Sequence, residues 1–275
     1  MSESPHARRV ILAWLVLSVV VTPIVVLVLG PHLPPGSDSN VANEQVDVNT
    51  ILVASLTPII VLFVVFFAYV LVVFHERGDG SQDGPPIHGH QQLQTLWIVL
   101  TSVFVLAFAA YGSVKLLQTG AGGGQGPSPV AEPSGAKLPV QVIGQQWEFT
   151  YRYPTYGGVE TPHLVLPVGR QIELHVTSID ATHSFWAYGL GVKADANPGV
   201  DNVAYVKPVK LGSFEIRCAE LCGLWHGYMY NAGRVVSPQQ FHAWITSQQK
   251  VYEPIAKYLP AFRKTYLPDP QRRGG

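Results

Sequence analysis

Charged side chains are scarce in this sequence. They make up 13% of the 275 residues, whereas hydrophobic residues make up 47%. A typical soluble protein has about a quarter of its residues charged. The 18 Lys and Arg residues are also balanced by 18 Asp and Glu residues, so we expect no nucleic-acid partner. The apolar residues must therefore lie in a membrane or form an unusually large core.

Cysteine is equally rare. The two cysteines, Cys218 and Cys222, are separated by only three residues. A pair so close together cannot form the framework of a disulfide-stabilised domain. The sequence also contains no C-x-x-C-H motif for haem attachment and no internal repeat. We therefore expect the two cysteines to belong to one local site.

Long apolar blocks account for most of the hydrophobic excess, and they cover Val10–Leu29, Ile51–Phe74 and Leu96–Leu117. Each block has about 20 residues or more, and a helix of that length crosses the ~30 Å of hydrocarbon in a bilayer. Within the blocks only Lys115 is charged, and its long side chain can reach the headgroups. The sequence thus predicts two or three transmembrane helices surrounded by membrane lipid.

Basic residues beside the apolar blocks predict their orientation, because Lys and Arg in short loops stay on the cytoplasmic side. Arg8 and Arg9 precede the first block, Arg77 follows the second, and residues 30–50 contain neither Lys nor Arg. Everything after Leu117 is therefore expected outside the membrane. The first block also has features of a secretory signal, but its length and the lack of an A-x-A cleavage site favour a retained span.

Composition divides the chain into five segments. Residues 1–50 hold the first span and an external loop, residues 51–118 a transmembrane helix hairpin, and residues 119–137 a Gly- and Pro-rich linker. Residues 138–250 are expected to form one external domain. Residues 251–275 contain four prolines, and we expect no regular structure in this tail.

The external domain, residues 138–250, has the pattern of an all-β fold. Short β-type runs joined by Gly- and Pro-containing turns predict a β-sandwich or barrel. In Gln171–Ser178 apolar and polar residues alternate, which predicts a strand with one solvent-exposed face. Ser237, Pro238 and Gln240 have the pattern of a helix start, and this helix is expected to close the domain.

The most informative window is RCAELCGLWHGYMY, which begins at residue 217. It contains Cys218, Cys222, His226 and Met229 at the spacing C-x3-C-x3-H-x2-M. Two thiolates, an imidazole and a thioether are the ligands that soft copper prefers. A second imidazole is needed to complete such a site. His183, in a loop between predicted strands, is the best candidate because a sandwich can bring two such loops together.

Other sites can be built from the same residue types. A blue-copper site has one copper ion and one thiolate, whereas the second thiolate here predicts a bridge between two copper ions. The cysteines could also form a disulfide, or two Cys and two His could hold structural zinc. Neither alternative explains Met229 at its spacing from His226. His163, His175 and His242 lack a companion at ligand spacing, and we interpret them as surface or structural histidines.

Two motifs resemble those of subunit II of the haem-copper cytochrome c oxidases. CAELCGLWHGYM matches the family's C-S-E-[IL]-C-G-x-x-H-x-x-M loop. The segment from Asp180 to Gly199 matches its D-x-x-H-S-[FW] and L-G-x-K-x-D-A-x-P-G patterns. The resemblance covers the second and third apolar blocks and the external domain to about Lys250. It implies a membrane-anchored all-β protein whose domain is a cupredoxin-like Greek-key β-sandwich.

The resemblance also implies roles for individual residues. The side-chain ligands of a dinuclear copper A centre would be His183, Cys218, Cys222, His226 and Met229. Glu220 would add its backbone carbonyl, and its carboxylate would bind a magnesium ion between subunits I and II. In GQQWEFTYRY, which begins at residue 144, Trp147 would be the point where electrons enter from the donor.

The match to the family has departures. Gln145, Phe149 and Tyr188 stand where the family has His, Trp and Pro, so electron transfer from the donor is expected to be tuned differently. Gln94 stands where the family has a Glu at the mouth of a proton channel. Residues 138–234 contain eight acidic and seven basic residues, and this near-balance leaves the donor open.

By this resemblance, the chain would be the copper A subunit of a terminal cytochrome c oxidase in a respiratory membrane, expected to be a bacterial plasma membrane. It would take electrons from an external cytochrome c or similar donor. It would pass them to haem in subunit I, where oxygen is reduced and protons are pumped. Subunit I and the other oxidase subunits would be its partners. A nitric oxide reductase with a copper A subunit is an alternative, as is a membrane-anchored copper chaperone.

Overall fold

The computed structural model describes residues 5–75, 89–119 and 136–256, and the chain divides by its contacts into two units. One unit is helical and comprises Met1–Leu33 and Asp47–Ser113. The other comprises Pro34–Val46 and Val114–Gly275 and contains the β-sheets.

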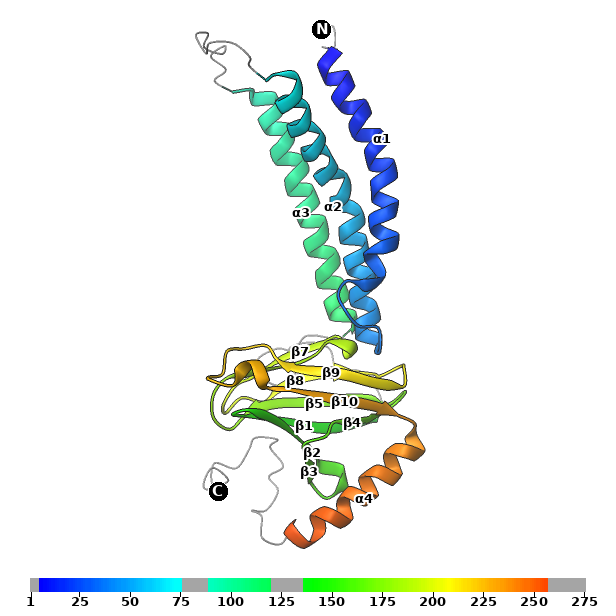
Figure 1. Ribbon diagram of the computed structural model, residues 1–275, viewed down its shortest axis with the longest axis vertical. Coiled ribbons are helices and arrows are strands. Elements are labelled where there is room, and N and C mark those ends of the chain that lie inside the picture. Colours follow the sequence, from blue (N-terminus) through cyan, green and yellow to red (C-terminus); the bar gives the residue numbers. More distant parts are fainter. Residues whose placement is uncertain (1–4, 76–88, 120–135, 257–275) are drawn as a thin grey trace. The chain divides into compact units, whose positions relative to one another are not determined.

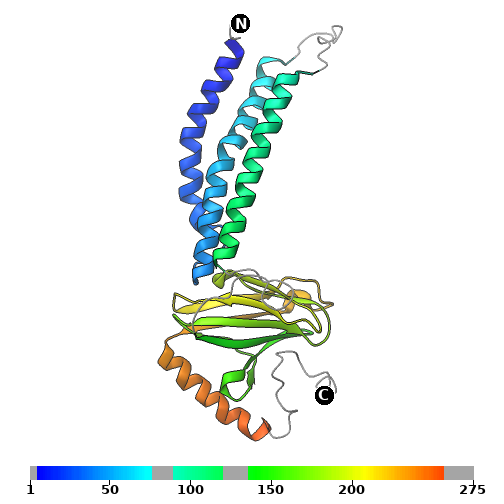
Figure 2. The same ribbon diagram turned by 180° about the vertical axis from the view of Figure 1, so that it is seen from behind.

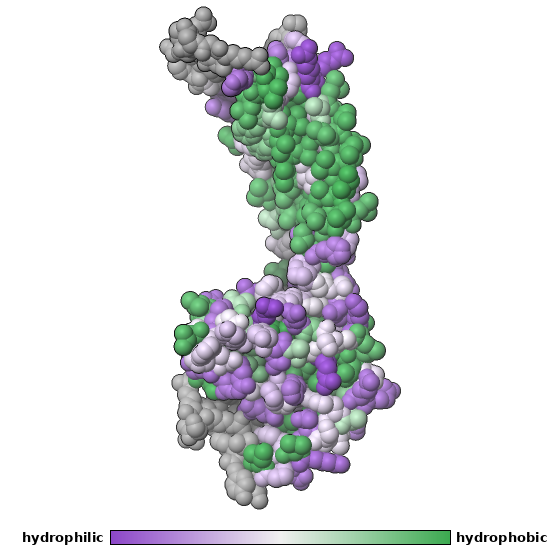
Figure 3. Space-filling view, viewed as in Figure 1, coloured by the Kyte–Doolittle hydropathy of each residue, from purple (hydrophilic) through white to green (hydrophobic). Residues whose placement is uncertain are grey.

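The long helices of the first half are α1 (Pro5–Val28), α2 (Asn40–Val73) and α3 (Gln91–Thr119) (Figure 1). Within the described ranges, these are the three helices long and apolar enough to cross a membrane. Their surfaces carry mainly hydrophobic side chains, many of them exposed (Figure 3). Extensive exposed apolar surface is expected where helices face lipid. The prediction of two or three apolar spans is confirmed, and the number is three.

Helix α2 begins at Asn40, eleven residues before the apolar block that starts at Ile51. The prediction of a loop over residues 30–50 is therefore wrong for residues 40–50. Ser39 explains the early start, because its hydroxyl accepts a hydrogen bond from the Ala42 N–H at 3.0 Å and so caps the first turn. The same hydroxyl donates to the carbonyl of Leu190 at 2.7 Å, a contact that the local sequence does not reveal.

Residues Pro34–Val46, which we call the strap, belong to the β-sheet unit although they lie after α1 in the sequence and include the first residues of α2. The Asp38 N–H donates to the Gly189 carbonyl at 2.9 Å, and the Asp38 carbonyl accepts from the Val209 N–H at 2.8 Å. Val41 in the strap is also buried. Backbone hydrogen bonds on both sides of Asp38 thus make the strap an integral part of the external domain.

The external domain contains two five-stranded sheets within the residues that the structure describes, in the orders β3-β2-β1-β5-β8 and β4-β10-β9-β6-β7. The strands are β1 (Lys137–Gln145), β2 (Glu148–Tyr153), β3 (Val159–Thr161), β4 (Val165–Pro167), β5 (Gln171–Ser178), β6 (His183–Ala187), β7 (Val192–Ala196), β8 (Asn202–Val206), β9 (Gly212–Cys218) and β10 (Tyr230–Val236). β1 pairs with β5 and β4 with β10 in parallel, and such pairs require crossovers. The predicted β-sandwich is confirmed.

One apolar core lies between the two sheets. Val140 and Val142 point into it from β1, and Phe149 from β2 packs edge-on against Phe185 from β6, with ring centroids 5.6 Å apart. Both cysteines and Met229 belong to the same buried cluster. The candidate site is therefore built on one end of the core and shares its packing.

Helix α4 (Pro238–Ala256) packs beside β3 and β4 (Figure 2). The Gln240 N–H donates to the Ser237 hydroxyl at 3.2 Å, and the Ser237 N–H donates to the Gln240 side chain at 3.0 Å. This reciprocal pair is the capping box that the sequence predicted. Phe241 and Ile245 are buried against the core, so the prediction of a closing helix is confirmed.

The end of α4 differs from the prediction, because the helix continues to Ala256 instead of giving way to an irregular tail at residue 251. Pro254 removes one backbone donor, but it lies in the last turn, where little helix remains to be broken. Gln249 donates to the Tyr156 carbonyl at 3.2 Å, and Tyr252 packs on the core. These contacts hold the last turns. The tail from residue 257 and most of the linker lie outside the described residues.

Strand β5 was predicted to have one solvent-exposed face, and this is wrong for its second half. His175 is 5% exposed and Thr177 is fully buried. β5 lies between β1 and β8, and the His175 Nδ1 atom lies 2.9 Å from a carboxylate oxygen of Asp201 at the edge of β8. His175 is thus a structural histidine and not a surface one, whereas His163 and His242 are exposed as expected.

Candidate metal centre

Strand pairing brings the predicted ligands together. β9 ends at Cys218 and its antiparallel partner β10 begins at Tyr230, so the connecting loop returns to its starting point. The Cys218 N–H donates to the Met229 carbonyl at 3.0 Å and closes this loop. β6 begins at His183, and its register with β9 sets Phe185 opposite Cys218. Three strand ends therefore meet at one edge of the sandwich.

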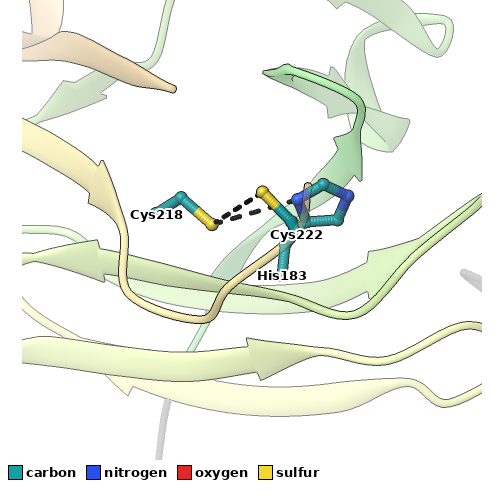
Figure 4. A group of neighbouring side chains, drawn as sticks. All are labelled: His183, Cys218 and Cys222. Carbon is teal, nitrogen blue, oxygen red and sulfur yellow. Dashed lines mark hydrogen bonds between the residues drawn. The ribbon is translucent and has the colours of Figure 1, made fainter. Parts of the chain in front are cut away.

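The two cysteines lie between two histidines. Cys218 Sγ lies 3.7 Å from Cys222 Sγ and 3.9 Å from His183 Nδ1 (Figure 4). On the other side, Cys222 Sγ lies 3.5 Å from His226 Nδ1 and 3.8 Å from Met229 Sδ. Each sulfur thus faces its own imidazole. All five side chains predicted as ligands converge on this site.

Glu220 presents its two polar groups differently. Its carbonyl oxygen lies 3.2 Å from Cys218 Sγ, at the edge of the cluster. Its side chain is exposed. Among the described residues, the His, Cys, Asp and Glu side chains close enough to share one metal ion are those of His183, Cys218 and Cys222. The structure therefore brings the backbone of Glu220 to the site, but not its carboxylate.

The two thiols differ in acidity. Burial raises the pKa of Cys218, but hydrogen bonds with His183 and with the backbone outweigh burial and lower this pKa to about 6. Burial and the neighbouring Cys218 raise the pKa of Cys222 to about 12. Two adjacent thiolates repel each other, so both lose their protons together only when a cation compensates their charge. The pair is therefore suited to holding a metal.

His183 is fully buried and tightly held. Its Nε2 atom lies 2.9 Å from Asp180 Oδ1. A carboxylate can only accept, so Nε2 carries a proton, and Nδ1 is the nitrogen that faces Cys218. Burial lowers the pKa of His183, but its hydrogen bonds with Cys218 and Asp180 raise it overall. A Cβ atom at position 144 would lie 3.0 Å from His183 Cδ2, so Gly144 is what gives the ring its space.

Trp147 rests on the loop that carries the cysteines. A Cβ atom at Gly223 would lie 3.3 Å from Trp147 Nε1, so the indole lies directly against the backbone beside Cys222. The preceding residue, Gln146, donates its side-chain N–H to the Cys222 carbonyl at 2.8 Å. Sequence reasoning singled out Trp147 but neither Gln146 nor Asp180. The D-x-x-H spacing before His183 is the signal that could have revealed Asp180.

The outer side of the loop carries large exposed hydrophobic side chains. Leu221 and Leu224 are 77% and 82% exposed, and Trp225 and Tyr228 pack against each other beside them, with ring centroids 5.5 Å apart. His226, which lies between the two aromatic residues in sequence, is only half-buried. Exposed apolar groups gathered in this way are typical of a surface that meets another protein.

Comparison with known proteins identifies the family. Residues 159–236 match the family described as "Cytochrome C oxidase subunit II, periplasmic domain". The crystal structure of the periplasmic domain of subunit II of cytochrome oxidase (CoxB) of Bradyrhizobium japonicum is 33% identical in sequence, and the match covers 43% of this chain and 98% of that one, with a TM-score of 0.42. The chain belongs to the cytochrome c oxidase subunit II family.

Longer members of the family match more of the chain. The cytochrome c oxidase subunit 2 of Thermostichus vulcanus is 26% identical, over 83% of this chain and 79% of the relative. The probable cytochrome c oxidase subunit 2 of Rickettsia bellii is 29% identical, over 70% of this chain and 75% of the relative. These matches extend well beyond the β domain and therefore include part of the helical half.

Membership in the subunit II family gives the chain a place in a haem-copper oxidase complex with other subunits. Its apolar helices and its match to the family's periplasmic-domain model indicate a membrane protein with an external domain, which is the two-sheet β-sandwich. The family implies copper, and the residues fit this metal. Two thiol sulfurs, two imidazole nitrogens and a thioether sulfur, gathered around the cysteine pair, form a donor set of the softness that copper prefers.

Proposed function

We propose that this chain is the copper A subunit of a terminal cytochrome c oxidase. Its external domain accepts single electrons from cytochrome c and passes them to haem in subunit I, where oxygen is reduced to water and protons are pumped. The chain does not reduce oxygen by itself. The observation that carries the proposal is the pair of cysteine sulfurs 3.7 Å apart, each facing a different histidine.

The ligand residues in this proposal divide into two groups around the cysteine pair. His183 and the Glu220 carbonyl serve the side of Cys218, and His226 and Met229 serve the side of Cys222. These residues would hold two copper ions, which would supply a site that takes up and releases one electron at a time.

The role of the protein in this proposal is to keep the ligands still. Cys218 and His183 lie at the ends of neighbouring strands of one sheet. A backbone hydrogen bond holds Cys218, and the Asp180 carboxylate holds His183. Cys222 and Met229 are each 2% exposed. Ligands that cannot relax after an electron arrives lower the barrier to transferring it onward.

We propose Trp147 as the residue through which electrons enter. Its indole lies between the solvent and the loop that carries Cys222, and Gly223 leaves room for it to lie in direct contact. A conjugated ring in this position shortens the path from a docked donor to the ligands. The proposed role of Trp147 therefore depends on the position of its indole ring and not on gain or loss of a proton.

We also propose that Glu220 serves two sites. Its carbonyl faces Cys218, whereas its exposed carboxylate is free to meet a magnesium ion held against subunit I. Carboxylate oxygens are the ligands that magnesium prefers. One residue would then connect the copper site to the subunit interface.

The test is to purify the complete oxidase from membranes and supply reduced cytochrome c. We expect oxygen consumption, two copper ions per copy of this chain, and a spin signal from one electron shared by two copper nuclei. Nitric oxide consumption in place of oxygen consumption would show a nitric oxide reductase. Bound copper without electron transfer from any donor would favour a chaperone. A signal confined to one nucleus would contradict the dinuclear site.

A further inference from the structure

The Asp180 carboxylate gathers polar groups from two parts of the domain. Its Oδ1 atom lies 2.9 Å from His183 Nε2 and 3.2 Å from Ser178 Oγ, and it accepts the Ala181 N–H at 2.6 Å. Its Oδ2 atom accepts the Gln146 N–H at 2.7 Å. One oxygen thus serves His183 and the other serves the turn between β1 and β2. The carboxylate joins the buried imidazole to the turn that carries Trp147.

Gln146 extends this link to the cysteine loop. Its backbone N–H donates to Asp180, and its side-chain N–H donates to the Cys222 carbonyl at 2.8 Å. The next residue, Trp147, lies against Gly223, which follows Cys222 in the same loop. A continuous chain of hydrogen bonds therefore runs from His183 through Asp180 and Gln146 to Cys222.

We propose that Asp180 and Gln146 are positioning residues that fix His183 and the cysteine loop against the turn that carries Trp147. Asp180 sets the tautomer and the electron-donor strength of the His183 ring. Gln146 keeps Trp147 seated on the loop. This inference rests on the proposed copper site, but it concerns how the surrounding residues hold that site.

The chemistry of the carboxylate makes Asp180→Asn an informative change. Asp180 uses both of its oxygens as acceptors, one for His183 and one for the Gln146 N–H. An asparagine has one acceptor oxygen and places a donor NH2 group at the other position, so one of the two bonds is lost. Loss of such an outer partner typically lowers metal affinity or activity by about 10- to 100-fold.

The experiment compares variants of the full chain within the purified oxidase. We expect Asp180→Asn to weaken copper binding by about tenfold or more, to raise the midpoint potential of the site, and to alter its spin signal. The potential should rise because a carboxylate partner favours the oxidised, more positive state. Glu148→Gln is the charge-matched control. Glu148 is an exposed carboxylate next to Trp147, and in the described part of the chain its side chain bonds only to Gln145.

Gln146→Ala tests the second half of the link. It removes the bond to the Cys222 carbonyl but keeps the backbone N–H that Asp180 accepts. We expect an unchanged potential and spin signal, and reduction by reduced cytochrome c that is slower by about tenfold. Gln145→Ala is the matched control, since Gln145 is the neighbouring residue of the same type and its side chain bonds to Glu148.

The outcomes separate this inference from the proposed function. A wild-type oxidase without the two-copper signal would overturn the function itself. A normal wild-type signal with Asp180→Asn indistinguishable from Glu148→Gln in potential and signal would overturn only the role of Asp180. Gln146→Ala reduced as fast as Gln145→Ala would overturn the role of Gln146. If thermal unfolding shows that the Asp180 variant does not fold, the comparison of Gln146→Ala with Gln145→Ala tests the inference by itself.

Discussion

The two histidines of the site are held by different kinds of structure. His183 is fully buried at the start of strand β6, with Asp180 on one nitrogen and Phe149 packed edge-on at 6.2 Å between ring centroids. His226 is half-buried in a single 3-10 turn beside exposed aromatic and aliphatic side chains. The difference teaches that one side of the site is part of the core, whereas the other side is an exposed apolar surface of the kind that typically meets another protein.

The largest effect on the metal site is expected at Cys218, which lies between the core side and the surface side. Cys218→Ser replaces the thiolate that faces both Cys222 and His183 with a hydroxyl, which does not ionise near neutral pH and cannot bridge. We expect the variant to lose the two-copper spin signal completely. Metal analysis and spin resonance of the purified oxidase measure this. An unaltered signal with two copper ions per chain would rule out the bridge.

The next effect separates the two histidines directly. His183→Ala leaves a cavity and an unpaired Asp180 oxygen, so we expect the copper-free domain to lose about 2–4 kcal/mol of unfolding free energy. His226→Ala removes a half-buried side chain from the loop, and we expect a loss of no more than about 0.5 kcal/mol. Denaturant unfolding without copper measures both. Equal losses would contradict the division into a core side and a surface side.

Two glycines test the same division with a smaller change. In Gly144→Ala the new methyl group would lie 3.0 Å from the His183 ring, and we expect a loss of about 1–3 kcal/mol of unfolding free energy. Gly227→Ala is the control in the loop, because a Cβ atom there meets nothing within 4 Å. Thermal unfolding should show a lower midpoint for the first variant only. A stable Gly144→Ala protein would mean that the His183 pocket is not tightly packed.

The smallest structural effect is expected at Met229. Met229→Leu conserves volume at a position that is 2% exposed, so we expect a loss of less than about 1.5 kcal/mol in unfolding free energy. The thioether is a weak ligand, so two copper ions should still bind while the midpoint potential changes. Redox titration followed by the spin signal measures this. Loss of one copper ion would show that Met229 is essential to binding and does not merely tune the potential.

Most of the site could be predicted from the sequence because its ligands are close together in the chain. One window of the sequence contains Cys218, Cys222, His226 and Met229, and their spacing predicts that they bind the same metal site. His183 is different, because only the pairing of β6 with β9 brings it beside Cys218. Its place between two predicted strands suggested it as a candidate, and the family resemblance gave it a role.

The errors share one physical cause, which is contact between distant parts of the chain. The early start of α2 depends on Ser39, whose hydroxyl bonds to Leu190. The burial of His175 depends on the strands beside β5 and on Asp201. The length of α4 depends on Gln249 reaching the Tyr156 carbonyl. Local composition describes each of these segments as polar or irregular, and only the tertiary structure reverses that description.

The strap can complete its contacts with the external domain only late in synthesis, because its partners lie far along the chain. Asp38 and Ser39 are made early, but their partners in the domain follow about 150 residues later, after two further spans. The strap can therefore dock only after the segment from Gly189 to Val209 has been synthesised. Closure of so long a loop is slow, so docking of the strap is expected late in biogenesis. In a domain expressed without residues 34–46, the Gly189 carbonyl and the Val209 N–H would lose their partner Asp38. Water or another chain would then have to bond to these two groups.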